Sequence, residues 1–75
     1  MSIRAPDHND AAVGLRIRAA RIMRGVSQTA LAARLGITGQ QVAKYESGEN
    51  RVAVCRLADI AAGLGLPVTY LLTGT

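Results

Sequence analysis

Residues 36–51, GITGQQVAKYESGENR, carry side chains whose types and spacing could recognise the edges of bases. At about 100° per residue, a helix through this stretch places Val42 and Tyr45 on one side. The opposite side then consists of Gln40, Ala43, Lys44 and Ser47. A glutamine amide can hydrogen-bond to adenine through both of its polar groups, and a lysine can donate to O6 or N7 of guanine. This side is therefore suited to a major groove, although such residues more often form an ordinary solvated helix surface.

Base contact is favoured over the solvated surface because another helix precedes this one with the spacing of a helix-turn-helix pair. Ser27 is a suitable N-cap for a helix over residues 28–35, and Gly36 follows as a stop residue. Thr38 and Gln41 have the T-x-x-Q spacing of a capping box, which predicts the start of the next helix. A connection of a few residues between the two helices is typical of the motif.

Small and apolar residues stand where packing between these two helices requires them. Ala32 is small enough for close approach, and Gly36 can adopt the positive φ that the turn requires. Val42 and Tyr45 point back toward the first helix of the pair. Together these positions predict that the polar side of the second helix faces outward.

The remaining apolar spacing predicts three further helices. One begins near Asp10, a plausible N-cap, and runs to Arg24. Its core side contains Val13, Ile17 and Ala20. Another helix covers residues 54–64, and a short one closes the chain. We therefore predict an all-α, compact five-helix domain over residues 10–75, with the helix-turn-helix formed by its second and third helices and a disordered tail over residues 1–9.

Composition restricts the partners and the chemistry. The net charge of +4 favours a polyanion, and nucleic acid is the leading candidate. Tyr45 and Tyr70 are the only aromatic residues, so duplex is preferred over single strands, whose binding relies on aromatic stacking. The single cysteine, Cys55, and the single histidine, His8, make no catalytic or metal-binding constellation with the scattered carboxylates. We expect no enzyme activity, no cofactor and no metal.

Localisation signals are also missing from the sequence. No apolar run approaches the roughly 20 residues that span a bilayer. The start, MSIRAPDHND, lacks the apolar centre of a signal peptide. We therefore expect a cytoplasmic protein with no membrane partner.

The chain resembles the lambda-repressor-like, Cro-type family of DNA-binding domains, also called the XRE family. The resemblance covers nearly everything after the tail and rests on IRAAR (17–21), GVSQTALAARLGIT (25–38), QQVAKYESG (40–48) and LADIAAGLGLPVTYLLTG (57–74). It implies a five-helix fold in which Gln40, Gln41 and Lys44 lie at or near base-contacting positions. It also implies a phosphate contact by Gln28 and a partly buried salt bridge between Arg21 and Glu46.

Two positions of the third helix complicate base recognition. Gly39 occupies the first turn, where many relatives carry a long side chain that touches bases. Glycine cannot make that contact, so we expect reduced sequence discrimination. Gln41 stays ambiguous, because its amide could turn back to Thr38 in the capping box as readily as contact a base.

Phosphate contacts would set the position of the domain on a duplex. We expect them from Gln28, Thr38, Ser47, Asn50 and Arg51. The alternatives are a plain first-turn residue for Gln28, solvated loop residues for Asn50 and Arg51, and a purely capping role for Thr38. The other arginines are interpreted as mostly solvated contributors to the positive field, namely Arg16, Arg18, Arg24, Arg34 and Arg56.

Two apolar groups exceed what a small core needs. The first lies at the C-terminal end and predicts a homodimer, at least on DNA, through Leu66, Val68, Tyr70, Leu71 and Leu72. The second consists of Leu15, Ala19 and Ile22, on the side of the first helix opposite its core stripe. These residues are either ordinary exposed apolar residues or a contact surface for a second protomer, a toxin or RNA polymerase.

The function predicted from these observations is a sequence-specific, double-stranded DNA-binding transcriptional regulator that uses its third helix in the major groove. A repressor is favoured over an activator, because occlusion of a promoter requires no further domain. The alternative is an antitoxin-like protein-interaction module that binds a toxin and autoregulates its operon.

Overall fold

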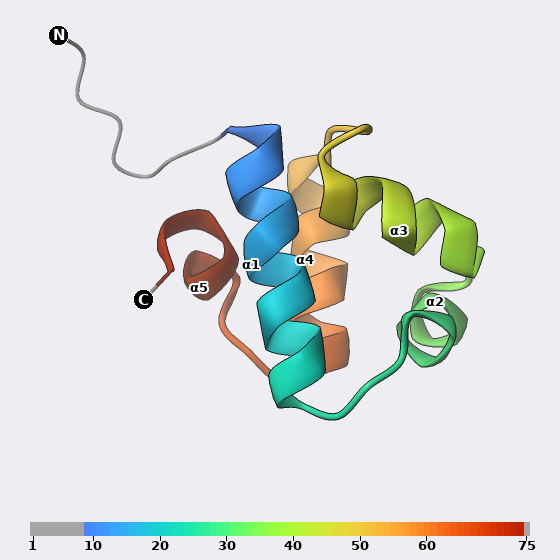
Figure 1. The fold of residues 1–75 in the computed structure, drawn as a ribbon. Helices are drawn as coiled ribbons and strands as arrows, with labels where there is room; N and C mark the ends of the chain where they lie inside the picture. Colours follow the sequence, from blue (N-terminus) through green and yellow to red (C-terminus); the bar gives the residue numbers. More distant parts are fainter. Residues whose placement is uncertain (1–8, 75) are drawn as a thin grey trace, which may run out of the picture.

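The computed structural model describes residues 9–74, and within this range the chain forms five helices and no strand. The helices are α1 (Asp10–Met23), α2 (Gln28–Leu35), α3 (Gly39–Ser47), α4 (Val54–Leu64) and α5 (Val68–Thr73) (Figure 1). The predicted all-α, five-helix architecture is confirmed for this range. Residues 1–8 of the tail predicted over residues 1–9 lie outside the described residues. None of the described helices has the length and apolar character needed to cross a membrane.

Side-chain caps start the first three helices. Asn9 caps α1, because its Oδ1 accepts hydrogen bonds at 2.9 and 3.2 Å from two backbone N–H groups of the first turn. The expected cap, Asp10, is instead the first helical residue, and Asn9 belongs to the domain rather than to the tail. The prediction was wrong by one residue because both residue types are good caps and spacing alone does not separate them. Ser27 and Thr38 cap α2 and α3 as predicted.

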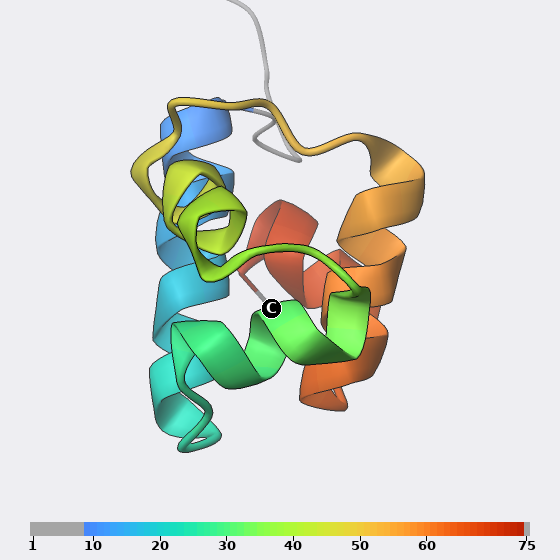
Figure 2. The same cartoon turned by 90° about the vertical axis from the view of Figure 1, so that its right-hand side faces the viewer.

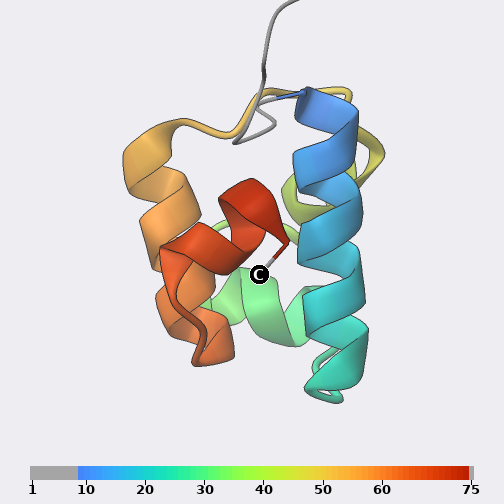
Figure 3. The same cartoon turned by 90° about the vertical axis from the view of Figure 1, so that its left-hand side faces the viewer.

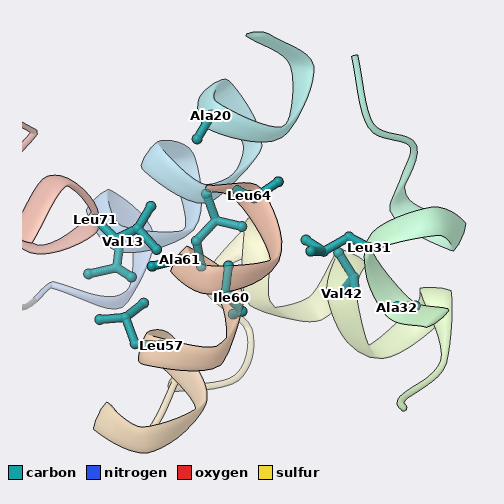
Figure 4. Close-up of a cluster of buried hydrophobic side chains, with 11 residues drawn as sticks. Val13, Ala20, Leu31, Ala32, Val42, Leu57, Ile60, Ala61, Leu64 and Leu71 are labelled. Atoms are coloured by element: carbon teal, nitrogen blue, oxygen red, sulfur yellow. The ribbon is translucent and has the colours of Figure 1, made fainter. Parts of the chain in front are cut away.

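The helices pack in layers around one core. α1 and α4 lie side by side, with α5 on one face of the pair and the α2–α3 pair on the other (Figures 1 and 3). Buried apolar side chains from all five described helices meet between these layers (Figure 4). The largest of them are Ile17, Leu31, Val42, Ile60 and Leu71. Burial of each such side chain contributes about 1.5–3 kcal/mol to folding, so these contacts hold the α2–α3 pair on the rest of the domain.

Leu71 belongs to this core and not to a dimer surface. Its side chain is fully buried in the single chain, where α5 packs on α1 and α4. The prediction that Leu71 contacts a second protomer is therefore wrong. Apolar spacing in a six-residue helix does not show which side faces the helix's own domain. The other members of the predicted dimer surface remain partly exposed: Leu66, Val68, Tyr70 and Leu72.

α1 and α3 touch through their backbones. A Cβ atom added at Gly14 of α1 would lie 2.5 Å from the carbonyl oxygen of Glu46 and 2.8 Å from its carbonyl carbon, closer than side chains can pack. Gly48 ends α3 with a φ of +81° and lies against Ala11 in the same way. A Cβ added at Gly48 would lie 2.9 Å from the Cα of Ala11. These two glycines therefore set the distance between α3 and α1.

Candidate nucleic-acid interface

α3 has one buried side and one exposed side. Val42 is 1% exposed, Glu46 is 6% exposed, and Tyr45 packs partly buried against the core. The exposed side consists of Gln40, Lys44 and Ser47. The orientation expected from helical spacing is thus present in the structure. The outer surface of α3 offers an amide, an ammonium group and a hydroxyl to whatever approaches it.

α2 holds α3 in this orientation. Ala32 is buried where the two helices pack, and Gly36 ends α2 in the left-handed conformation with a φ of +71°. The chain then returns across α2 before α3 begins (Figure 2). Gly39 at the start of α3 lies near the start of α2, since a Cβ added there would lie 3.6 Å from the Thr29 hydroxyl oxygen. The two N-termini are therefore neighbours, and each has backbone N–H groups without an intrahelical acceptor.

A buried hydrogen-bond network connects α3 to α1 and α2. The Glu46 carboxylate accepts hydrogen bonds from Nε of Arg21 at 2.6 Å and from Nη2 of the same residue at 3.1 Å. The side-chain amide of Gln28 donates to the same carboxylate at 3.0 Å. The salt bridge that the resemblance implies is therefore present. The position of the Gln28 amide was not foreseen, because the sequence suggested that it would reach outward to a phosphate.

Thr38 and Ser47 use their hydroxyl groups within or beside α3. The Thr38 Oγ1 accepts a hydrogen bond from the Gln41 backbone N–H at 3.1 Å. Within residues 9–74 the Gln41 side chain makes no return bond to Thr38, so only half of the predicted capping box forms. Ser47 donates to the Lys44 carbonyl at 3.1 Å and accepts from the Glu49 N–H at 3.2 Å. These contacts stabilise the ends of α3, and the Gln41 amide is not committed to capping.

The loop after α3 presents Asn50 and Arg51, and both are exposed. Nε of Arg51 lies 3.3 Å from Oδ1 of Asp10, and the Arg51 side chain is 81% exposed. An exposed ion pair of this kind contributes about 0–1 kcal/mol, so Arg51 can exchange Asp10 for another anion at little cost.

Arginines also bind the C-terminal ends of neighbouring helices, which the sequence did not show. Arg16 donates to the Leu72 carbonyl of α5 at 2.7 Å, and Arg34 donates to the Gly63 carbonyl of α4 at 2.6 Å. Arg24 and Arg56 donate to the carbonyls of Gly65 and Leu35 at 3.3 and 3.4 Å. Cations are favourable at these ends because the last carbonyls lack intrahelical donors. The interpretation of these arginines as mostly solvated agrees with the exposure of Arg18, Arg24 and Arg34, whereas Arg16 and Arg56 are partly buried.

Gly39 has room for a side chain. Its φ is not in the left-handed region, and an added Cβ would make only ordinary contacts with Thr29. We expect Gly39→Ala to raise the free energy of unfolding by up to about 1 kcal/mol, because alanine loses less backbone entropy in a helix. Urea denaturation of both proteins measures the difference.

Gly36→Ala is the control for this substitution. Gly36 also has open space around its Cα, but its φ of +71° strains any other residue. We expect Gly36→Ala to lower the free energy of unfolding by about 1–2 kcal/mol. If both variants were destabilised equally, the view that Gly39 is replaceable would be wrong.

The outer face of α1 carries exposed apolar side chains. Leu15 is 64% exposed and Ile22 is 56% exposed, as the spacing predicts, and Ala19 lies exposed between them. Met23, which is 68% exposed, extends this group and was missed. Isolated exposed apolar residues are common, but here they share one helix face.

The fold and the outward side of α3 define a small, all-helical helix-turn-helix domain. The chain belongs to the helix-turn-helix family of the XRE type, whose family model matches residues 17–71. Among curated relatives, it is 46% identical over 63 residues to an uncharacterized transcriptional regulator in the ATPase CF(0) region of Rhodospirillum rubrum. That match covers 84% of this chain and 58% of the relative. The chain spans about half the length of the curated relatives it matches.

Solved structures show the same lambda-repressor-like fold. The clp gene regulator ClgR from C. glutamicum superimposes with a TM-score of 0.82 at 27% identity, over 84% of this chain and 82% of that chain. The P22 c2 repressor protein, solved in complex with the synthetic operator 9T, superimposes with a TM-score of 0.75 at 28% identity, over 84% of this chain and 96% of that chain. The predicted fold class is therefore confirmed.

Proposed function

We propose that this chain binds double-stranded DNA with α3 in the major groove and regulates transcription in the cytoplasm, as a repressor. The observation that carries the proposal is the orientation of α3: Gln40 and Lys44 are exposed, whereas Val42 on the same helix is buried. The names of the relatives support this class of function, and the P22 c2 repressor was crystallised on an operator.

Base recognition would use the exposed side of α3. The Gln40 amide is suited to adenine and the Lys44 ammonium group to guanine, and Gln41 adds a partly buried amide beside them. Gly39 contributes no side chain, so the surface has few groups that distinguish bases. We expect a preference for a short sequence in each half-site, with modest discrimination.

Phosphate contacts would surround the groove that α3 enters. Gln28 would offer its backbone N–H at the start of α2, while its amide stays bonded to Glu46. Thr38 is the N-cap of α3, and Ser47 is the last residue of that helix. Asn50 and Arg51 would bind the backbone from the following loop, with Arg51 leaving Asp10 for a phosphate.

A dimer would place two copies of α3 in successive major grooves, about 34 Å apart. The partly exposed residues Leu66, Val68, Tyr70 and Leu72 are the surface that we propose for this contact. A dimer bound across a promoter would exclude polymerase without any further domain.

Substitutions of Lys44 and Arg51 test the proposal. Selection from a random duplex pool should show that Lys44→Ala changes the preferred base at one position and weakens the wild-type site by about 1–3 kcal/mol. Arg51→Ala should weaken all duplexes similarly and reduce the salt slope of log K by about 0.9. Arg24→Gln is the control, because Arg24 follows α1 and donates to the Gly65 carbonyl at the end of α4 instead of lying on the exposed side of α3. Identical base preferences in wild type and Lys44→Ala would contradict base contact by α3.

The second candidate function is an antitoxin-like module that binds a toxin and autoregulates its operon. The exposed side chains of Leu15, Ile22 and Met23 favour it, because they form an apolar face free for a protein partner. Selection alone does not separate the two functions, because an autoregulating antitoxin also recovers a consensus. Replacing Leu15 and Ile22 with polar residues separates them: the antitoxin-like function requires that binding of a protein partner or assembly is lost while folding is kept. If these substitutions change neither, the second candidate is wrong.

A further inference from the structure

Most of the positive charge in the described part of the chain is held by internal hydrogen bonds. The arginines that donate to carbonyls or carboxylates of this chain are Arg16, Arg21, Arg24, Arg34, Arg51 and Arg56. Within residues 9–74, no hydrogen bond or ion pair occupies the side chain of Arg18 or that of Lys44. Lys44 lies on the exposed side of α3, where the proposed function uses it. Arg18 has no role in that account.

Arg18 lies on the side of α1 that faces α3. It lines a groove of ≈ 520 Å³ between the two helices, which are neighbours along this side (Figure 1). The α3 wall of the groove includes Ala43 and Ser47, which lie one residue before and three residues after Lys44. Gln28, a proposed phosphate contact, also lines it. The groove is therefore continuous with the proposed DNA-binding surface.

The charge of Arg18 is not balanced inside this groove. Glu46 is the only acidic residue that lines it, and both of its carboxylate oxygens accept hydrogen bonds from other residues. The Glu46 side chain is 4% exposed, so it is not available to Arg18. An exposed guanidinium beside neutral amide and hydroxyl groups suits a phosphodiester, which accepts hydrogen bonds from the planar fork of arginine.

We propose that Arg18 binds a DNA phosphate along the α1–α3 groove when α3 enters the major groove. This inference rests on the proposed function and extends its phosphate contacts from α2, α3 and the following loop to α1. It assigns the base contacts to Lys44 and its neighbours and an anchoring contact to Arg18.

Salt-dependent titration of a random-sequence duplex tests the inference. Arg18→Gln should reduce the slope of log K against log salt by about 0.9, so that wild type loses roughly three to four times more affinity than the variant between about 50 and 200 mM salt. Arg18→Lys should keep the wild-type slope, because it keeps the charge. Arg24→Gln should also keep it, as a loss of the same charge from the C-cap residue of α1.

Three results would overturn the inference. If Arg18→Gln kept the wild-type salt slope while Lys44→Ala and Arg51→Ala still weakened duplex binding, the phosphate contact by Arg18 would be disproved and the proposed function would stand. Absence of duplex binding by the wild-type chain would remove both. If Arg18→Gln lost binding to poly-glutamate but kept the wild-type salt slope on duplex, Arg18 would be assigned to an acidic protein partner instead. Thermal melting of Arg18→Gln should match wild type, which shows that the change in slope is not a loss of folding.

Discussion

Replacing Glu46 with alanine is expected to lower the free energy of unfolding by about 3–5 kcal/mol, because it leaves the buried charge of Arg21 without its partner. The Gln28 amide loses its acceptor in the same variant. A single core of this size rarely supplies more than about 3–5 kcal/mol, so the loss approaches the whole stability of the domain. Far-UV circular dichroism should show a melting temperature lower by about 12 °C or more, or an unfolded chain at room temperature.

Two controls separate the buried pair from a general loss of negative charge. Glu49→Ala removes an exposed carboxylate two residues beyond α3, and its stability should stay within about 0.5 kcal/mol of wild type. The double variant Arg21→Leu/Glu46→Leu should be more stable than Glu46→Ala, because it leaves no unpaired charge in the core. A Glu46→Ala protein that melts like wild type would show that the network does not hold α3 in place.

Gly14→Ala is expected to destabilise the domain by about 1–3 kcal/mol, whereas helix propensity alone predicts that it stabilises the domain. An alanine within α1 would ordinarily gain about 1 kcal/mol over glycine. Here the new Cβ would meet the carbonyl group of Glu46, and backbone atoms cannot move aside as a flexible side chain does. α3 would have to shift away from α1, so duplex binding should weaken together with stability. Urea denaturation and duplex titration measure the two effects.

Gly63→Ala provides the matched comparison within α4. An added Cβ there would lie 3.4 Å from Cδ1 of Leu31 and 3.9 Å from Cβ of Arg34, both of which are side-chain atoms. We expect this variant to be neutral or stabilised by up to about 1 kcal/mol. If Gly14→Ala and Gly63→Ala behaved alike, close backbone approach would not explain the glycine in α1.

The helix-turn-helix pair is predictable from the sequence because its signals are local. Ser27 and Thr38 mark helix starts, Gly36 marks a helix end, and helical spacing then decides which side of α3 is buried. The core positions of α1 and α4 follow from the same spacing. Each of these inferences depends on residues within a few turns of one another.

Most of the features that sequence reasoning missed depend on contacts between distant parts of the chain. Arg16 and Arg34 find carbonyl groups only because other helices end beside them. Leu71 is buried because α5 folds back against α1 and α4. Gly14 offered a signal, since an isolated glycine within a helical pattern often marks close packing, but it did not identify the partner.

One side of α3 is packed inside the domain and the other is exposed, and this division limits how the domain can be retargeted to another sequence. The whole helix cannot be replaced by one from a donor protein, because a helix without a carboxylate at position 46 would leave Arg21 without its ion-pair partner. Redesign should instead graft new side chains onto one half of the helical cylinder, at positions 39, 40, 44 and 47, and leave the inner half untouched.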